Sequence, residues 1–375
     1  MKKIDFNQPF FFKRDFKAIE KSLKSKNVSG NGYYTDKCHE FFYKKFNFKN
    51  CLITSSCTDA LEMCAILSNI KPGDEVIVPS FTFVSTANAF ELRGAKIKFA
   101  DSEDHNPNIS IKSLKKLVSY KTKCVVIVHY AGFACDLDEI LKLKKKYNFI
   151  LIEDSAHAIN MKYKNKFLGS IGDLSTFSFH QTKNITCGEG GLLVINNKKF
   201  LNRAKIIWEK GTNRDKFKKG FVKKYEWVDI GSSFLPSDIT ASLLYSQLLN
   251  LEKIQRKRFE IWNIYYDLLK KNKNINISKS FNKKNHNAHM FYITTKSKKE
   301  RDQLKKFLLS KNIFCNEHYN CLHLSKYYRQ NYNLKTEYNN ALKFEKTLLR
   351  LPIHYSLIKK DIRFVVKTIQ EFYNE

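Results

Sequence analysis

The chain has 375 residues, 43% of them hydrophobic, which is enough for a large core and for two domains. Its formal net charge of +31 would suit a nucleic-acid partner, because a basic surface attracts phosphate. The charge is spread along the chain without a dense basic block or an RNP-type aromatic motif, so we expect no nucleic-acid partner. A non-catalytic nucleic-acid-binding or regulatory protein remains the alternative from a different class.

Cysteine usage and hydropathy indicate the compartment. The nine cysteines include no CxxC pair. The start "MKKIDFNQPFFFKRDF" does not fit a signal peptide, because Lys13, Arg14 and Asp15 interrupt its apolar run. No apolar run approaches the roughly 20 residues that span a bilayer. We therefore expect a reduced, cytoplasmic protein that does not bind membranes.

Short apolar strands alternate with helical patterns through the first two thirds of the chain. Helices are expected at 59–70, 84–94 and 136–147, and strands at 51–54, 75–80, 96–101, 124–130, 149–155, 174–180 and 191–196. This alternation is typical of an α/β fold, with a mainly parallel sheet sandwiched by helices. In such sheets, ligands bind beyond the carboxyl ends of the strands.

The pattern changes after Pro236. Ser237 is placed to cap one long helix over 238–271, with Leu244 and Leu248 near one face. A strand at 289–295 and helices at 298–310 and 359–373 follow. We expect a large α/β domain over residues 1–240, and a linking helix with a smaller α+β domain over 241–375.

Polar residues follow three of the expected strands. In "SSCTDAL" (55–61), Ser56 and Asp59 have capping-box spacing. The N–H groups of such a helix start would bind a phosphate, although a plain N-cap is the alternative. In "ILIEDSAHA" (150–158), the strand ends in Glu153 and Asp154, with His157 three residues further on. A buried carboxylate there needs a cation or a hydrogen-bond donor, whereas a solvated loop would need neither.

The third stretch is "FSFHQTKNITCGEGG" (177–191). Ser178 lies in the expected strand, Lys183 follows it, and the glycines at 188, 190 and 191 allow a tight return into the next strand. The GxxxxGK order of a Walker sequence is absent. A lysine held near a pocket with a depressed pKa can form a Schiff base with a carbonyl.

These parts together suit pyridoxal 5′-phosphate. The acid would keep the pyridine nitrogen protonated, and the lysine would hold the aldehyde. The helix start and Ser178 would hold the phosphate, and Phe83 could stack on the ring.

Three segments of the chain resemble the DegT/DnrJ/EryC1/StrS family of sugar-nucleotide aminotransferases. They are "PGDEVIVPSFTFVSTANA" (72–89), "IEDSAHA" (152–158) and "SFHQTKNITCGEGG" (178–191), and the similarity runs from 30 to 357. The resemblance implies a pyridoxal-phosphate-dependent transferase of fold type I, the aspartate-aminotransferase fold. Family members are dimers whose active sites borrow residues from the partner chain.

The resemblance also implies roles for individual residues. Lys183 would bind the cofactor covalently and then act as acid and base, and Asp154 would pair with the pyridine nitrogen. His157 would lie near the phenolic oxygen. The cofactor-binding positions are Cys57, Thr58, Phe83, Asp154, His157, Ser178, Lys183 and Ser233, and the expected substrate-binding residues are Lys210, Arg214, His318, Tyr319 and His323.

Within the family, the chain is most similar to transaminases that move an amino group from L-glutamate to a dTDP-4-keto-6-deoxyhexose. Their product, dTDP-4-amino-4,6-dideoxygalactose, serves bacterial surface polysaccharides. Amination of a 3-keto sugar nucleotide is the close alternative. A dehydratase-type branch has histidine in place of the lysine, and Lys183 argues against it.

Some positions depart from the family's pattern. The wider family has Gly at the position of Cys57, Asn at Ser233 and Arg at Leu235, and many relatives have Gln at His157. The favoured subgroup also lacks the family's residues at the first three of these positions. The departures therefore weaken the comparison with the wider family but not the comparison with that subgroup.

One competing motif is "CNEHYNCLH" (315–323). It offers four candidate zinc ligands, Cys315, His318, Cys321 and His323. Their spacing is tighter than that of a usual zinc finger, so we expect no metal.

Overall fold

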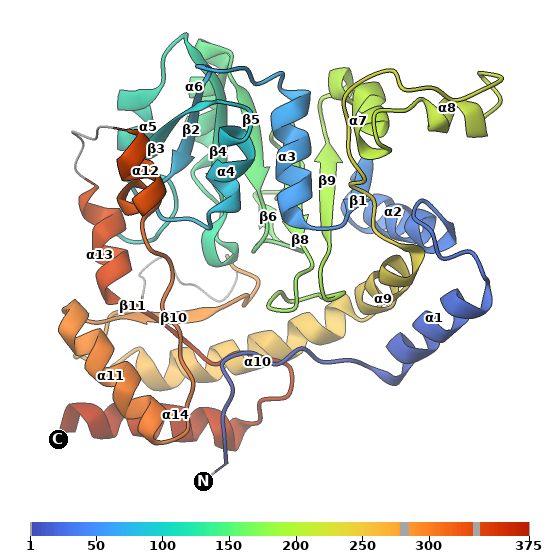
Figure 1. Ribbon diagram of the computed structural model, residues 1–375. Helices are drawn as coiled ribbons and strands as arrows, with labels where there is room; N and C mark the ends of the chain where they lie inside the picture. The colour runs from blue at the N-terminus through green and yellow to red at the C-terminus, as the bar shows by residue number, and fades with distance from the viewer. Residues whose placement is uncertain (1, 278–284, 333–337, 375) are drawn as a thin grey trace.

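The computed structural model describes residues 2–277, 285–332 and 338–374. Its main feature is a seven-stranded sheet in the order β1-β9-β8-β5-β4-β2-β3 (Figure 1). Only β9 runs against the other strands, so the expected mainly parallel sheet is confirmed. The strands are β1 (Cys51–Thr54), β2 (Glu75–Pro79), β3 (Lys96–Ala100), β4 (Thr122–Val128), β5 (Ile150–Asp154), β8 (Leu174–Ser178) and β9 (Gly191–Ile195).

Alternate residues of the strands enter different cores, as the two-residue period of a strand requires. In β4, Val126 packs in the core that also holds α3, whereas Val125 and Ile127 face α5 and α6. In β9, Leu193 and Leu192 divide between two cores in the same way. The sheet is therefore buried on both faces, which explains why its strands read as continuous apolar runs.

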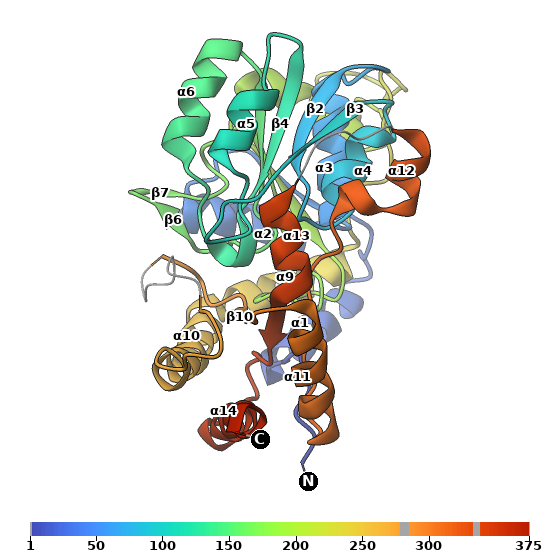
Figure 2. The same cartoon turned by 90° about the vertical axis from the view of Figure 1, so that its left-hand side faces the viewer.

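Helices cover both faces of this sheet (Figures 1 and 2). Their bounds are α1 (Lys13–Lys24), α2 (Tyr33–Phe46), α3 (Cys57–Leu67), α4 (Ser85–Glu91), α5 (Ile111–Leu117), α6 (Leu137–Tyr147), α7 (Leu201–Trp208), α8 (Arg214–Lys218) and α9 (Asp238–Leu248). The expected helices at 59–70, 84–94 and 136–147 correspond to α3, α4 and α6. Short hairpin strands β6 (Lys162–Tyr163) and β7 (Lys166–Phe167) pair beside the sheet.

The single helix expected over 238–271 is wrong, because the structure divides it into α9 and α10 (Leu251–Leu269). Ser237 caps α9 as expected, accepting a hydrogen bond from the amide of Thr240 at 3.2 Å. The break lies at Asn250. Its side-chain amide donates to the carbonyl of Ser246 at 3.1 Å and takes the acceptor that a continuing helix would offer to the backbone.

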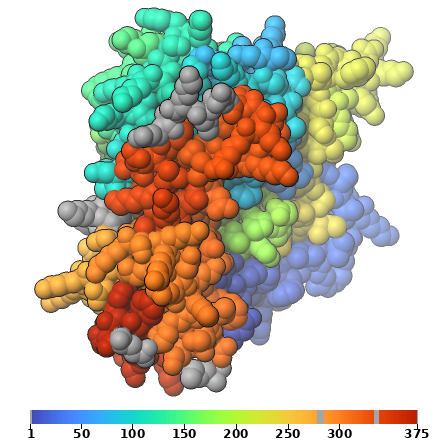
Figure 3. All heavy atoms as spheres, turned by 60° about the vertical axis from the view of Figure 1, so that its left-hand side comes forward, coloured from blue at the N-terminus to red at the C-terminus, as the bar shows by residue number. Residues whose placement is uncertain are grey.

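The C-terminal third builds a smaller α+β unit around a two-stranded sheet. Its elements are β10 (Phe291–Thr294), β11 (Leu348–Leu351), α11 (Lys298–Ser310), α12 (Lys326–Asn331), α13 (Asn339–Thr347) and α14 (Lys359–Asn374). Figure 3 shows its orange and red atoms packed against the teal and blue atoms of the large sheet layer. The N-terminal segment joins this unit through a bridge between Ile4 and Ile313. The domain boundary near residue 240 stays a prediction.

Among the described residues, no helix is long and apolar enough to cross a membrane.

Candidate active site

A cavity of about 610 Å³ opens at the carboxyl ends of the parallel strands, between the large sheet and the C-terminal unit. This is where a parallel sheet is expected to bind ligands. Its lining brings together nine of the residues singled out from the sequence: Cys57, Thr58, Phe83, Asp154, His157, Ser178, Lys183, His318 and Tyr319.

The start of α3 forms one wall of the cavity. Ser56 is its N-cap and accepts a hydrogen bond from the amide of Asp59 at 3.0 Å. The hydroxyls of Thr58 and Ser85 lie 2.8 Å apart. Gly191 passes so close that a Cβ there would lie 2.4 Å from the carbonyl oxygen of Ser56. The first-turn N–H groups, the helix dipole and the hydroxyls make this wall suited to a phosphate.

Asp154 lies at the end of β5 and is 5% exposed. Its carboxylate accepts hydrogen bonds from the Thr86 hydroxyl at 2.8 Å and from the amide of Ala156 at 3.2 Å. Burial raises the pKa of Asp154 above its usual value, although these two donors and the nearby charge of Lys183 oppose the rise. A cationic N–H in the cavity would complete the environment of this carboxylate.

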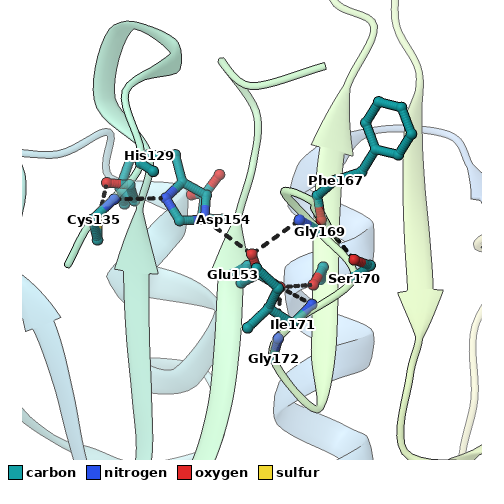
Figure 4. A network of polar contacts seen from close by, with 12 residues as sticks. His129, Cys135, Glu153, Asp154, Phe167, Gly169, Ser170, Ile171 and Gly172 are labelled. Atoms are coloured by element: carbon teal, nitrogen blue, oxygen red, sulfur yellow. Dashed lines mark hydrogen bonds and ion pairs between the residues drawn. The ribbon is translucent and has the colours of Figure 1, made fainter. Parts of the chain in front are cut away.

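Glu153 points to the opposite side of β5 and is a structural residue (Figure 4). Its carboxylate accepts from the Ser175 hydroxyl, from Nε2 of His129 at 3.0 Å, and from three amides of the following loop, those of Gly169, Ile171 and Gly172. Burial opposes its ionisation, but these donors hold the pKa of Glu153 below its usual value. The two adjacent carboxylates therefore have separate tasks.

Lys183 lies in the turn after β8, where its amide donates to the carbonyl of His180 at 2.9 Å. Removal from bulk water lowers the pKa of Lys183 from 10.5 to about 8, and the charge of Arg350 acts in the same direction, against Asp154. At neutral pH this amine loses its proton far more readily than a surface lysine. It can therefore serve as a nucleophile.

His157 is buried and neutral. Burial, followed by the charges of Lys183 and Arg350, holds the pKa of His157 well below its usual value. Its Nδ1 accepts from the amide of Ala131 at 3.4 Å, so Nε2 carries the ring proton. His157 stacks on His289, with 4.4 Å between ring centroids. The site thus holds one fixed hydrogen-bond donor of the kind expected near a phenolic oxygen.

His318 and Tyr319 enter the cavity from the loop between α11 and α12. Their rings stack at 3.8 Å, and Nδ1 of His318 lies 3.2 Å from the hydroxyl of Tyr130. Tyr319 also approaches Phe83, with 6.2 Å between ring centroids. His318, Tyr319 and Phe83 thus give the cavity an aromatic lining.

Four predicted site residues lie outside this cavity. His323 is buried and hydrogen-bonded through Nδ1 to the hydroxyl of Ser80 at 2.5 Å, so its ring is held behind the loop and does not face the cavity. Lys210, Arg214 and Ser233 lie around α8 and the segment after it, away from the cavity of their own chain. Their roles remain predictions that depend on a second chain.

Sequence reasoning missed several residues that the fold brings to the site. Thr86 was within a quoted motif, but its bond to Asp154 requires the fold. Arg258, His289 and Arg350 come from α10, the segment before β10, and β11, and all three line the cavity. The one available signal was Arg350 itself, a lone cation within the apolar run "LLRLPI".

The candidate zinc motif has no common centre. His318 contacts Tyr130, and His323 is bonded to Ser80. Within the described ranges, the side chains that converge as metal ligands are Glu103, Asp104 and His105, which lie elsewhere.

The donor set fits pyridoxal phosphate. A buried carboxylate with an incomplete set of donors, an amine with a depressed pKa and a helix start approached by a glycine match its ring nitrogen, aldehyde and phosphate. Phe83 lines the cavity and is 55% exposed, so its ring is accessible to a bound ligand.

Comparison with known proteins gives the same family. Residues 11–370 match the DegT/DnrJ/EryC1/StrS aminotransferase family. The chain is 32% identical over 364 residues to the UDP-4-amino-4,6-dideoxy-N-acetyl-beta-L-altrosamine transaminase of Campylobacter jejuni, covering 95% of this chain and 93% of that protein. It is 30% identical over 378 residues to GDP-perosamine synthase of Escherichia coli O157:H7, covering 100% of both.

Among solved structures, the aminotransferase PseC of Helicobacter pylori, involved in the biosynthesis of pseudoaminic acid, has the same fold. Its TM-score is 0.91 at 26% identity, over 100% of both chains. The expected fold type I architecture is thereby confirmed, as is the predicted cofactor class, since this family depends on pyridoxal phosphate.

Proposed function

The chain belongs to the DegT/DnrJ/EryC1/StrS family of pyridoxal-phosphate-dependent sugar-nucleotide aminotransferases, and from this premise we propose its reaction. L-Glutamate gives its amino group, and the acceptor is C4 of a nucleotide-linked 4-keto-6-deoxyhexose. The observation that carries the proposal is that Lys183 and Asp154 share one cavity with the N-terminus of α3.

The chain's own residues account for the proton transfers. Asp154 would hold a proton on the pyridine nitrogen of bound pyridoxal phosphate, and the cofactor would supply an electron sink. Lys183 would hold the aldehyde of the cofactor and, with its amine free, would take a proton from the donor's α-carbon through Nζ and return a proton during the transfer. His157 would donate from Nε2 to the cofactor and help to orient its ring, and Phe83 would cover one face of that ring.

The identity of the nucleotide is the finer part of the proposal. The sequence resemblance predicts dTDP, whereas two similar proteins carry UDP and GDP in their names. One of those names specifies a 4-amino-4,6-dideoxy sugar, which supports amination at C4 rather than at C3. We retain dTDP-4-keto-6-deoxyhexose as the proposed acceptor, with dTDP-4-amino-4,6-dideoxygalactose as the product for surface polysaccharide.

The test uses the purified protein with bound pyridoxal phosphate. Glutamate should bleach the yellow protein, and a keto-sugar nucleotide should restore the colour with release of an amino sugar. A panel of dTDP-, GDP- and UDP-linked 4-keto-6-deoxy sugars and one 3-keto sugar, each analysed by chromatography, ranks the acceptors by kcat/KM. Failure of glutamate to bleach the protein would refute the aminotransferase assignment, and a preference for GDP or UDP would refute the nucleotide.

A further inference from the structure

The N-terminal segment before α1 passes the cofactor cavity as an extended strap, residues 4–10, whose two ends are anchored to different parts of the molecule. Figure 1 shows it within the dark blue trace that crosses α10 on its way to α1. At one end, Ile4 makes two backbone hydrogen bonds with the segment 312–314, at 2.9 and 3.0 Å. At the other end, the carbonyl of Phe10 accepts from Nε2 of Gln247 on α9 at 3.1 Å. The strap therefore links the C-terminal unit to the large domain.

Between its anchors the strap separates two cavities. The cofactor cavity has a volume of about 610 Å³, and a smaller cavity of about 360 Å³ adjoins it. Four residues line both cavities: Phe6, Asn7, Thr182 and Asn316. The first two belong to the strap, so a single extended segment forms this wall of the cofactor site.

The middle of the strap is held by few contacts. Among the described residues, no backbone-to-backbone hydrogen bond joins residues 5–9 to another segment. The side-chain amide of Asn7 donates to the carbonyl of Gln181 at 3.2 Å. The ring of Phe6 lies against the guanidinium of Arg350, with Cζ 4.6 Å from the ring centroid. A segment with firm ends and so few contacts between them can open locally while its ends stay in place.

The partner of Asn7 lies in the turn that carries Lys183. The amide of Lys183 closes this turn on the carbonyl of His180, and Nδ1 of His180 lies 2.9 Å from the hydroxyl of Thr182. Within the part of the chain that the structure describes, Asn7 makes the one hydrogen bond that reaches residues 181–182 from another segment. Opening of the strap would therefore also release the tip of this turn.

We propose that Asn7 is a positioning residue that, by bonding to Gln181, holds the strap closed over the cofactor cavity and fixes the turn that carries Lys183. The role assigned to Lys183 rests on the proposed aminotransferase function. The closed strap keeps water from the reactive amine and retains the cofactor when no covalent bond holds it.

The electrostatics of Lys183 support a link between the strap and its amine. Burial is the largest cause that lowers the pKa of Lys183 from 10.5 to about 8. The titratable or charged groups that surround its amine come from other segments and are Cys57, Asp154, His157, His289 and Arg350. Asp5, the charged residue of the strap, lines only the smaller cavity. Opening the strap would thus change the access of water to Lys183, but not the charges around it.

The first measurement is the release of cofactor that is not covalently bound. Cofactor-free protein is loaded with pyridoxamine 5′-phosphate, which has no aldehyde to bond with Lys183, and its loss on dilution is followed by fluorescence. Asn7→Ala should release it about five- to tenfold faster, the scale of one net hydrogen bond. Asn7→Asp replaces the donor by an acceptor and should release it at least as fast. Gln8→Ala changes the exposed neighbour on the strap and should behave as the native protein does.

The second measurement uses pyridoxal phosphate and asks whether the turn is affected. In Asn7→Ala, the midpoint of cofactor uptake against pH should move upward, because the amine is less well shielded from water. Both half-reactions use Lys183, so their maximal rates should fall by a similar factor. The half-saturating concentrations of glutamate and of sugar nucleotide should change less than about twofold. The melting temperature should stay close to that of the native protein, because the lost hydrogen bond is exposed.

The outcomes separate this inference from the function on which it rests. If glutamate does not bleach the native protein, the aminotransferase proposal fails, while the release of pyridoxamine phosphate still tests the strap. Release from Asn7→Ala at the native rate, or an equal acceleration in Gln8→Ala, would overturn the role of Asn7. A loss confined to one half-reaction would overturn it as well, in favour of direct contact between Asn7 and that substrate.

Discussion

Glu153 and Asp154 show how one residue's place in a strand decides its task. Successive side chains of β5 point to opposite faces, so Asp154 enters the cavity and Glu153 enters the loop over 169–172. The sequence contained both carboxylates but gave no means of assigning their roles. The assignment depends on which face of the sheet carries the cofactor site.

The two carboxylates should respond oppositely to removal of their charge. Asp154→Asn should weaken cofactor binding and slow the glutamate half-reaction by about two orders of magnitude or more, because the pyridine nitrogen loses its charged partner. Glu153→Gln should lower the free energy of unfolding by about 2–4 kcal/mol, because an amide N–H would face several donors. Denaturant melts and stopped-flow absorbance measure the two effects. Equal loss of activity and stability in both variants would contradict the division.

The stabilisation that ionised Glu153 gives to the folded protein should also make the free energy of unfolding depend on pH. Because its pKa is lowered in the folded protein, its stabilisation is fully present above the unfolded value of about 4.3 and is lost as pH falls through the folded value. In Glu153→Gln, this part of the loss of stability in acid should be absent.

Lys183 should set the pH at which the chain takes up its cofactor. Only the neutral amine attacks the aldehyde, so the rate of uptake by cofactor-free protein should rise with pH. The midpoint should lie near the folded pKa of about 8, rather than near the ordinary value of 10.5. Because the charge of Arg350 helps to lower this pKa, Arg350→Met should move the midpoint upward. Absorbance of bound cofactor against pH measures both, and a midpoint at or above 10 would contradict the burial of the amine.

At the scale of elements, features that depend on neighbouring residues could be predicted from the sequence. Features that depend on contacts between distant segments could not. The strands and the residues at their ends were predictable, because apolar runs and the polar residues after them are local signals. The break at Asn250 was not, because the apolar pattern continues across it and one side-chain hydrogen bond ends the helix. Arg258 and Arg350 reach the cavity only through the packing of the C-terminal unit, which no local pattern encodes.

The loop between α11 and α12 shows a second difference between the prediction from the sequence and the structure. The sequence placed His323 in the substrate site with His318 and Tyr319, but the structure uses it as an anchor. His323 bonds to Ser80, the amide of Leu322 donates to the Ser80 carbonyl at 2.9 Å, and the amide of Cys321 donates to Glu345 at 2.8 Å. The loop that carries the two cavity residues is thus tied to the end of β2 and to α13.

His323→Ala should therefore act through the loop. We expect a loss of about 1–3 kcal/mol of stability and a higher half-saturating concentration of sugar nucleotide, with cofactor binding unchanged. His323→Asn can restore the bond to Ser80 and should recover most of both. If His323→Ala abolished turnover while the melting temperature stayed the same, direct contact with substrate would be the better explanation.

At the scale of the molecule, the segment around α8 projects from the sheet layer (Figure 1). It also carries several exposed apolar side chains. Trp227 is 80% exposed, and its neighbours in this exposed set are Phe217, Phe221, Tyr225, Val228 and Ile230. Such a concentration of exposed apolar residues marks an interaction surface. Lys210 and Arg214 adjoin it, which supports the predicted homodimer in which each chain completes its partner's site.

Mixing two defective variants tests the shared site. Lys183→Ala lacks the reactive amine, and the double variant Lys210→Met with Arg214→Met should bind sugar nucleotide weakly. If the residues of one site come from different chains, mixed dimers contain one complete site, and up to about a quarter of the native activity should return. Lys183→Ala mixed with Asp154→Asn should recover nothing, because those residues belong to the same chain's site. Absence of recovery in the first mixture would contradict the shared site.

The most direct test of the whole account is to find the lysine that carries the cofactor. The purified yellow protein is reduced with borohydride, digested, and mapped by mass spectrometry. The account predicts a pyridoxyl adduct on Lys183 alone, which disappears when glutamate is added before reduction. An adduct on another lysine, or no adduct on Lys183 in protein that transaminates, would contradict it.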